Sequence, residues 1–162
     1  MKGTSNLLSG NQVSKNAPVL HLVGALDELN SHLGLIKIKL SYYETGKDVC
    51  NFLETIQYNL LKLMSHTSNP IDADYFFTEA DTKLLQDEII HLKKAFPEIT
   101  SFVVPGKSET EAFIHIARTV ARKAERYFYA LDKELQLNEH SGEYLNILSE
   151  YLFYLALWVN SL

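Results

Sequence analysis

Apolar residues recur at intervals of three and four positions along most of this 162-residue chain, a spacing typical of amphipathic helices. The stretch from Val19 to about Leu40 illustrates it, with an apolar stripe at Leu22, Leu26, Leu29, Leu33 and Ile36. Only 7 Gly and 4 Pro interrupt the sequence, which favours long helices over many short strands. The chain is therefore predicted to be all-α.

Two further helices are predicted in the middle of the chain. One carries an apolar stripe from Val49 to Leu63. The next starts after Thr78, which together with Asp81 resembles an N-terminal capping box, and it ends before Pro97.

Two more helices are predicted in the last third. Ser108, with Glu111 three residues later, forms a capping box for a helix that runs to about Asp132. A fifth helix covers Glu139 or Ser141 to Asn160.

The segments between these helices are predicted to be loops or extended chain. They are residues 1–18, the connection from Ser65 to Tyr75, and an extended stretch from Ile99 to Gly106. No repeat or second domain is visible, so residues 1–162 are predicted to form one domain, with an N-terminal loop over 1–18 and a helical bundle over 19–160. The simplest architecture is a five-helix bundle.

Bulk composition excludes several classes of protein. A net charge of −5 argues against a nucleic-acid binder that works by bulk charge, although a few arginines can still hold a small anion. The single cysteine, Cys50, excludes an internal disulfide and a cysteine-based metal cage. No apolar run reaches the length of a membrane span and the N-terminus lacks a signal-peptide core, so a cytoplasmic protein with no membrane partner is predicted.

The fourth predicted helix carries an unusual row of like charges. Arg118, Arg122 and Arg126 follow one another at intervals of four, so their side chains stack on one face. Like charges at this spacing repel, and the nearby acid Glu125 is not in the same row. The row is either a solvated basic face or a site for a polyanion, because guanidinium groups are permanently charged and suited to phosphate oxygens.

Two other polar groups interrupt apolar helix faces. Asp27 lies next to core positions of the first helix, and is either a surface acid or the partner of an arginine such as Arg118 across an interface. Asn146 interrupts an apolar stretch of the last helix. A buried amide without a partner costs about 1–3 kcal/mol, so Asn146 either caps a neighbouring element or contacts a ligand.

These segments together resemble the ATP:cob(I)alamin adenosyltransferases of the PduO type, over nearly the whole chain. The resemblance is carried by Leu26-Asp27-Glu28-Leu29-Asn30-Ser31, Phe102-Val103-Val104-Pro105-Gly106, Ala117-Arg118-Thr119-Val120-Ala121-Arg122-Lys123-Ala124-Glu125-Arg126 and Tyr144-Leu145-Asn146-Ile147-Leu148-Ser149-Glu150. It implies a trimer of five-helix bundles whose active sites lie between subunits. It also implies transfer of the 5′-deoxyadenosyl group of ATP to the cobalt of cob(I)alamin, with ATP bound together with Mg²⁺ or another divalent ion.

The resemblance also assigns residues to the site. Arg122, Arg118 and Asp27 would be catalytic, Arg122 at the triphosphate and the other two as a salt bridge across the interface. Phe102 would face the corrin. The ATP site would comprise Gly3, Thr4, Ser5, Lys15, Arg122, Glu125, Arg126 and Asn146. No dedicated protein metal site is implied; a reductase or a cobalamin-dependent acceptor enzyme would be a further partner.

The sequence departs from the family pattern at both ligand sites. The family's N-terminal T-x-T-G-D segment is missing, Lys107 replaces a glycine, Lys123 and Ile147 each replace an arginine, and Glu150 replaces an aspartate. These differences leave open an alternative, a catalytically impaired homologue that acts as a trimeric corrinoid- or ATP-binding protein.

Two other readings explain less of the sequence. A ferritin-like metal bundle would use Glu88 and His91, which have Glu-x-x-His spacing, but no second copy follows and Glu111 and His115 are four residues apart. A generic helical interaction module would explain the bundle and leave the arginine row unexplained.

Overall fold

The computed structural model describes residues 3–72, 74, 76–94, 96, 99, 101–135 and 137–162. Within those residues the chain forms, in order, β1 (Thr4–Asn6), β2 (Gln12–Ser14), α1 (Pro18–Leu40), α2 (Gly46–Ser68), α3 (Glu79–Lys93), α4 (Glu109–Leu135) and α5 (Glu139–Val159). The predicted five-helix fold is thus confirmed, with a small hairpin added at the N-terminus.

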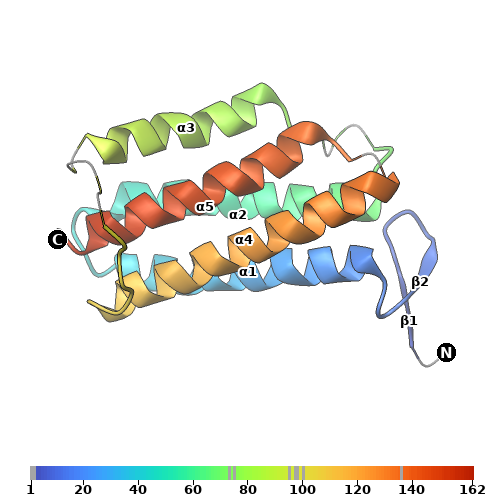
Figure 1. Ribbon diagram of the computed structural model, residues 1–162, viewed down its shortest axis with the longest axis horizontal. Coiled ribbons are helices and arrows are strands. Elements are labelled where there is room, and N and C mark those ends of the chain that lie inside the picture. Colours follow the sequence, from blue (N-terminus) through green and yellow to red (C-terminus); the bar gives the residue numbers. More distant parts are fainter. Residues whose placement is uncertain are drawn as a thin grey trace.

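The helices run roughly along one long axis (Figure 1). α4 packs against both α1 and α5, α1 also packs against α2, and α3 lies along α5 at the edge of the bundle. The hairpin lies at one end of the bundle, beside the start of α1, and the C-terminus lies at the other end (Figure 1). This arrangement places the middle of α4, with its arginines, next to α5.

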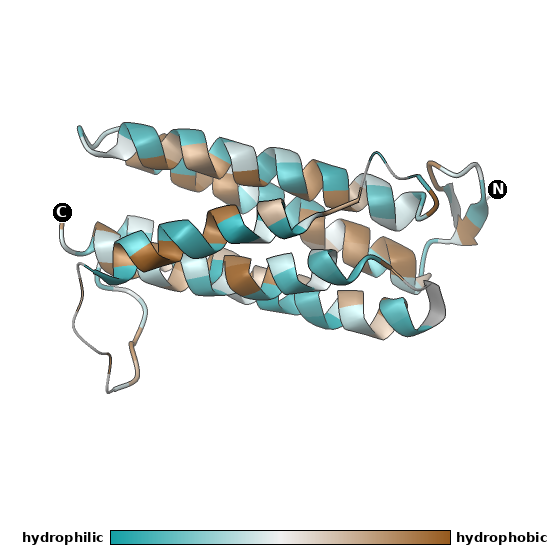
Figure 2. Ribbon diagram, turned by 90° about the horizontal axis from the view of Figure 1, so that it is seen from above, coloured by the Kyte–Doolittle hydropathy of each residue, from teal (hydrophilic) through white to brown (hydrophobic). Residues whose placement is uncertain are grey.

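The core follows the apolar stripes read from the sequence. Leu22, Leu26, Leu29, Leu33 and Ile36 of α1 are all fully buried, and burying one such side chain stabilises the fold by about 1.5–3 kcal/mol. Hydrophilic and hydrophobic segments alternate along each helix, as the amphipathic pattern requires (Figure 2). Among the described residues, no helix combines the length and apolar character that a membrane crossing needs.

α2 is longer than its apolar stripe predicts. It starts at Gly46 and continues to Ser68, so the loop predicted from Ser65 is wrong over its first four residues. The polar residues at its end do not break the helix because they are buried and bonded locally: the Thr67 hydroxyl donates to the Leu63 carbonyl at 2.8 Å.

The two predicted capping boxes differ in outcome. In α3 the Asp81 carboxylate accepts hydrogen bonds from the Thr78 backbone N–H at 2.8 Å and from its hydroxyl at 2.9 Å, which confirms the first box. In α4 the Ser108 hydroxyl accepts from the Glu111 N–H at 3.2 Å as expected. The Glu111 carboxylate, however, binds the backbone N–H groups of Gly106 and Lys107.

The N-terminal segment is a short antiparallel hairpin, so the prediction of a loop over 1–18 is wrong where β1 and β2 pair. Thr4 lies opposite Ser14 and Asn6 opposite Gln12. Gly10 turns the chain with a φ of 82°, a conformation that glycine adopts without strain. The Ser9 N–H donates to the Ser68 carbonyl at 3.3 Å, which joins the hairpin to the end of α2.

Candidate functional site: an arginine row beside α5

All arginines of the chain lie on α4. They are Arg118, Arg122 and Arg126, spaced by one helical turn each. Every ion pair among the described residues uses a lysine or a histidine, and none uses these guanidinium groups. Three stacked positive charges that pair with no carboxylate in the described part of the chain repel one another, so the row is suited to an anionic ligand.

A pocket opens on this row. It is lined by Arg122, Glu125, Arg126 and Tyr129 of α4 and by Asn146 of α5, and its volume is about 380 Å³. That volume lies within the range of about 300–1,000 Å³ that is typical of small-molecule sites. Arg126 donates from Nη1 to the Arg122 carbonyl at 2.9 Å, which holds its side chain along the helix toward Arg122.

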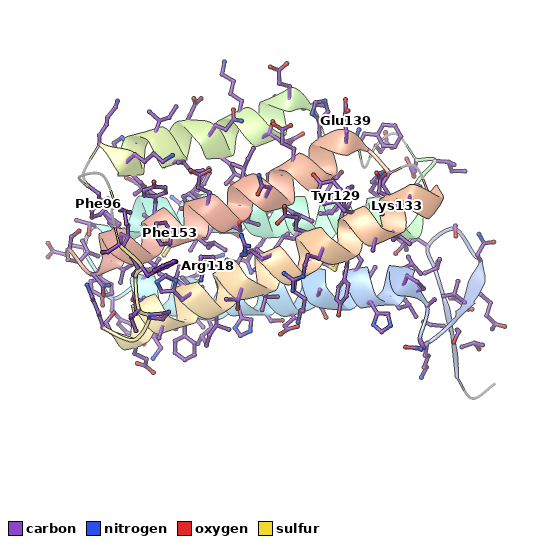
Figure 3. All side chains as sticks on the ribbon, viewed as in Figure 1. Phe96, Arg118, Tyr129, Lys133, Glu139 and Phe153 are labelled. Carbon is purple, nitrogen blue, oxygen red and sulfur yellow. The ribbon has the colours of Figure 1, made fainter. Side chains whose placement is uncertain are left out.

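Arg118 lies one turn before the pocket and is half-buried. Its Nε donates to His115 Nδ1 at 3.2 Å. Burial and the neighbouring Arg122 charge lower the pKa of Arg118 below its usual value, but the guanidinium remains charged. Figure 3 shows Arg118 at the same end of the bundle as Phe153, and Tyr129 farther along α4.

Asp27 is exposed on α1 and forms no ion pair with a described residue of its own chain. Its neighbour Glu28 instead pairs with Lys123, which joins α1 to α4. The predicted Asp27–Arg118 bridge is therefore not an intrachain contact, and the sequence reading did not anticipate the Glu28–Lys123 pair.

The other predicted site residues lie away from the pocket within one chain. Gly3, Thr4, Ser5 and Lys15 belong to the hairpin at the end of the bundle, where the Lys15 N–H donates to the Gly3 carbonyl at 2.9 Å. Phe102 protrudes fully into solvent from the segment before α4. The structure thus brings together Arg122, Glu125, Arg126 and Asn146, while the hairpin and Phe102 are separate.

Comparisons with known proteins show which family the chain resembles. A family profile described as "Cobalamin adenosyltransferase" matches residues 2–159. A cobalamin adenosyltransferase of Cupriavidus metallidurans is 38% identical over 98% of this chain and 83% of its own length. A corrinoid adenosyltransferase of Bacillus subtilis is 35% identical over 99% of this chain and 83% of its own length.

The chain belongs to the cobalamin adenosyltransferase family. A structure of a variant PduO-type ATP:corrinoid adenosyltransferase from Lactobacillus reuteri, complexed with cobalamin and ATP, has a TM-score of 0.90 and 29% identity, covering 99% of this chain and 90% of that one. The family, the helical fold and the ATP:corrinoid adenosyltransferase activity predicted from the motifs are confirmed.

One residue that lines the pocket of this cobalamin adenosyltransferase, Tyr129, was not predicted from the sequence. It lies seven residues after Arg122, two helical turns along the same row, so the spacing contained the signal. Burial raises the pKa of Tyr129, and so do the nearby carboxylates of Glu125, Asp132 and Glu143. Its hydroxyl therefore stays protonated at neutral pH and is able to donate a hydrogen bond to a ligand oxygen.

The described residues contain no group of three or more His, Cys, Asp or Glu side chains that would hold a metal ion in this adenosyltransferase. Glu88 and His91 instead line a second pocket between α2, α3 and α5, of about 360 Å³. The ferritin-like alternative therefore has no support in this part of the chain.

We expect the adenosyltransferase fold to lose stability as pH falls below about 6.5. Burial lowers the pKa of His66 and of His115 from the usual 6.5. His66 is buried and accepts the Asn138 N–H at Nε2, so protonation breaks that bond at the start of α5. Because the unfolded chain takes up protons more readily, stability is full above the unfolded pKa and is lost as pH falls.

Urea unfolding between pH 8 and pH 5 measures this effect. The midpoint should fall with acidification in the wild type and in a His21→Gln control, since His21 is exposed. In His66→Gln the fall should be smaller. A midpoint that does not change over this range would contradict the assignment.

Proposed function

We propose that the arginine row holds the triphosphate of ATP while cobalt(I) of reduced cobalamin attacks the 5′ carbon of the nucleotide. The new cobalt–carbon bond forms with the electron pair of cobalt(I). The bond from the 5′ carbon to oxygen breaks, and its electron pair leaves with triphosphate. The products are adenosylcobalamin and triphosphate.

The observation that carries this proposal is a row of guanidinium groups that pair with no carboxylate of the described residues, along a pocket that Asn146 of α5 also lines. Arginine binds phosphate oxygens with two parallel N–H donors, and such charge-assisted bonds are roughly twice as strong as neutral ones. In this displacement the negative charge develops on the leaving triphosphate, so Arg122 and Arg126 act where the charge appears. No proton has to be removed from a substrate, so no general base is required.

We infer that each site is completed by a neighbouring copy of the chain in a trimer. The hairpin residues predicted to bind ATP lie away from the pocket of their own chain. Neither Asp27 nor Arg118 forms an ion pair with a described residue of its own chain. In a trimer the hairpin and Asp27 of one subunit would reach the arginine row of the next. Light scattering after gel filtration should give the mass of three chains, and a monomer would contradict this arrangement.

Phe102 is proposed to cover the lower face of the corrin. Cobalt(II) is hard to reduce while its lower axial site is occupied, and an apolar side chain there displaces that ligand. Phe102 is fully exposed in the single chain, so its contacts within the fold are few. A large aromatic side chain held in solvent at this position is suited to a flat apolar ligand.

Phe102→Ala is therefore expected to keep the fold and lose activity. The unfolding free energy should change by less than about 0.5 kcal/mol, as for other surface substitutions. Adenosylation that starts from cob(II)alamin and a reductant should slow by about tenfold or more, or about 1.4 kcal/mol of barrier. The loss should be smaller when chemically prepared cob(I)alamin is supplied; equal rates with both substrates would contradict the role.

An anaerobic assay tests the function as a whole. Wild-type protein mixed with cob(I)alamin and ATP should produce the absorption spectrum of adenosylcobalamin, and calorimetric titration should show ATP binding. Binding of ATP or corrinoid without turnover would support the catalytically impaired alternative. Three points stay predictions. They are the binding of a divalent ion together with ATP, an interaction with a reductase or acceptor enzyme, and a cytoplasmic location.

A further inference from the structure

A buried chain of polar side chains runs along the start of α4, outside the arginine pocket. Glu111 is 0% exposed and His115 is 3% exposed. A carboxylate removed from water costs several kcal/mol unless it is hydrogen bonded or paired. A buried carboxylate such as Glu111 is therefore expected to have partners that compensate for the lost water. Those partners show which parts of the structure Glu111 connects.

At one end Glu111 holds the turn that precedes the helix. Its Oε2 accepts the Gly106 N–H at 2.7 Å and the Lys107 N–H at 3.1 Å. Gly106 has a φ of 109°, a conformation that glycine adopts without strain, and both N–H groups of the turn point to the same carboxylate oxygen. Since Phe102 lies four residues before Gly106, this carboxylate ties the segment carrying Phe102 to α4.

At the other end His115 holds Arg118. Arginine only donates, so the 3.2 Å contact from Arg118 Nε requires His115 Nδ1 to be without a proton. The neutral ring then carries its proton on Nε2, which lies 3.2 Å from Glu111 Oε1. The two atoms are in contact, and neither of them has a hydrogen-bond partner among the described residues.

We propose that Glu111 and His115 are positioning residues that connect the Phe102 segment to Arg118 through one buried relay. The relay occupies Arg118 Nε and leaves both Nη groups of that side chain for a ligand or for a neighbouring subunit. The contacts described above are the evidence that the relay exists. Its effect on turnover rests on the proposed function.

The relay works only while His115 is neutral. A second proton on the ring would sit on Nδ1 and replace the bond to Arg118 with repulsion between two cations. Burial and Arg118 lower the pKa of His115, and Glu111 acts against them. From α5 the neighbour is the uncharged Phe153 ring, 6.3 Å away, and the charged Lys39 of α1 is paired with Glu109.

Nitrogen-15 NMR of the histidine rings in the intact protein tests whether the relay exists. The His115 signals are assigned by their loss in His115→Gln. At pH 7.5 the wild-type ring should be the neutral form with its proton on Nε2, and Arg118→Leu should disturb this state. A ring that is charged, or protonated on Nδ1, would overturn the proposal whether or not the protein turns over substrate.

Kinetics test what the relay does. His115→Leu removes the acceptor at similar volume and should lower kcat/KM by about tenfold or more, and His115→Gln, which keeps an acceptor, should recover part of the loss. In the wild type, kcat/KM should fall at low pH as His115 becomes protonated. Because Glu111 raises the pKa of His115, Glu111→Gln should move this fall to lower pH.

A residue that only supports packing would not move the pH profile, so an unshifted acid limb in an active, folded Glu111→Gln variant would overturn the positioning role. If wild-type protein neither binds ATP nor turns over at any pH, the proposed function fails. The NMR result then decides the relay alone, since it needs no substrate. Should His115→Leu not fold, the Glu111→Gln profile and the wild-type ring signals remain as tests.

Discussion

Replacing Arg122 with alanine should lower kcat for adenosyl transfer by about 10²–10³-fold, the cost of removing one donor that stabilises developing negative charge. Arg122 is exposed, lines the pocket beside Asn146 and pairs with no carboxylate among the described residues. Its loss should therefore leave the fold intact and, if the proposed function holds, remove a cationic contact from the triphosphate. Steady-state rates with cob(I)alamin and ATP, together with ATP titration, measure the effect.

Two variants control this experiment. Arg122→Lys keeps the charge but loses the two-donor geometry, so its rate should lie between those of wild type and Arg122→Ala. Lys83→Ala removes an exposed positive charge from α3, remote from the pocket, and should behave as wild type. Normal turnover by Arg122→Ala would refute the role assigned to this arginine.

The largest effect on stability is expected for Gly46→Ala at the start of α2. A Cβ at this position would lie 2.1 Å from the Leu40 carbonyl oxygen and 3.0 Å from its carbon. These are backbone atoms at the end of α1, which cannot move aside without shifting the helix. Overpacking of this kind costs about 1–3 kcal/mol and sometimes more, and here the upper end is expected.

Gly34→Ala is the matched control. Gly34 lies inside α1, and its new Cβ would meet only Gln57 Nε2 at an ordinary 3.6 Å. The same substitution there should stabilise the helix by about 0.5–1 kcal/mol, because alanine is the better helix former. Urea unfolding of the two variants should therefore give shifts of opposite sign. A Gly46→Ala variant as stable as wild type would show that the turn after α1 is loose.

The helices were predictable because their signal is local. The spacing of apolar residues predicts α1 along its whole length, and the capping box that starts α3 needs only the four residues from Thr78 to Asp81. The hairpin was missed because its strands have three residues each, too few to show alternation. The extension of α2 to Ser68 was missed because its polar end is buried against the hairpin, a contact that the local sequence does not reveal.

The candidate site was predictable to the extent that it lies on one helix. The row from Arg118 to Arg126 follows directly from spacing by one turn. The relay was not predictable in the same way, since Glu111 and His115 share ordinary i, i+4 spacing and their importance comes from burial beneath α5 and the turn at Gly106. Contacts between different elements, or between chains, leave no periodic trace in the sequence.

The most direct measurement is a crystal structure of the protein with ATP bound. We expect triphosphate oxygens within hydrogen-bond distance of the Arg122 guanidinium of one chain, with the N-terminal hairpin of a neighbouring chain over the same nucleotide. A nucleotide bound elsewhere, with Arg122 and Arg126 extended into solvent and far from any second chain, would contradict it.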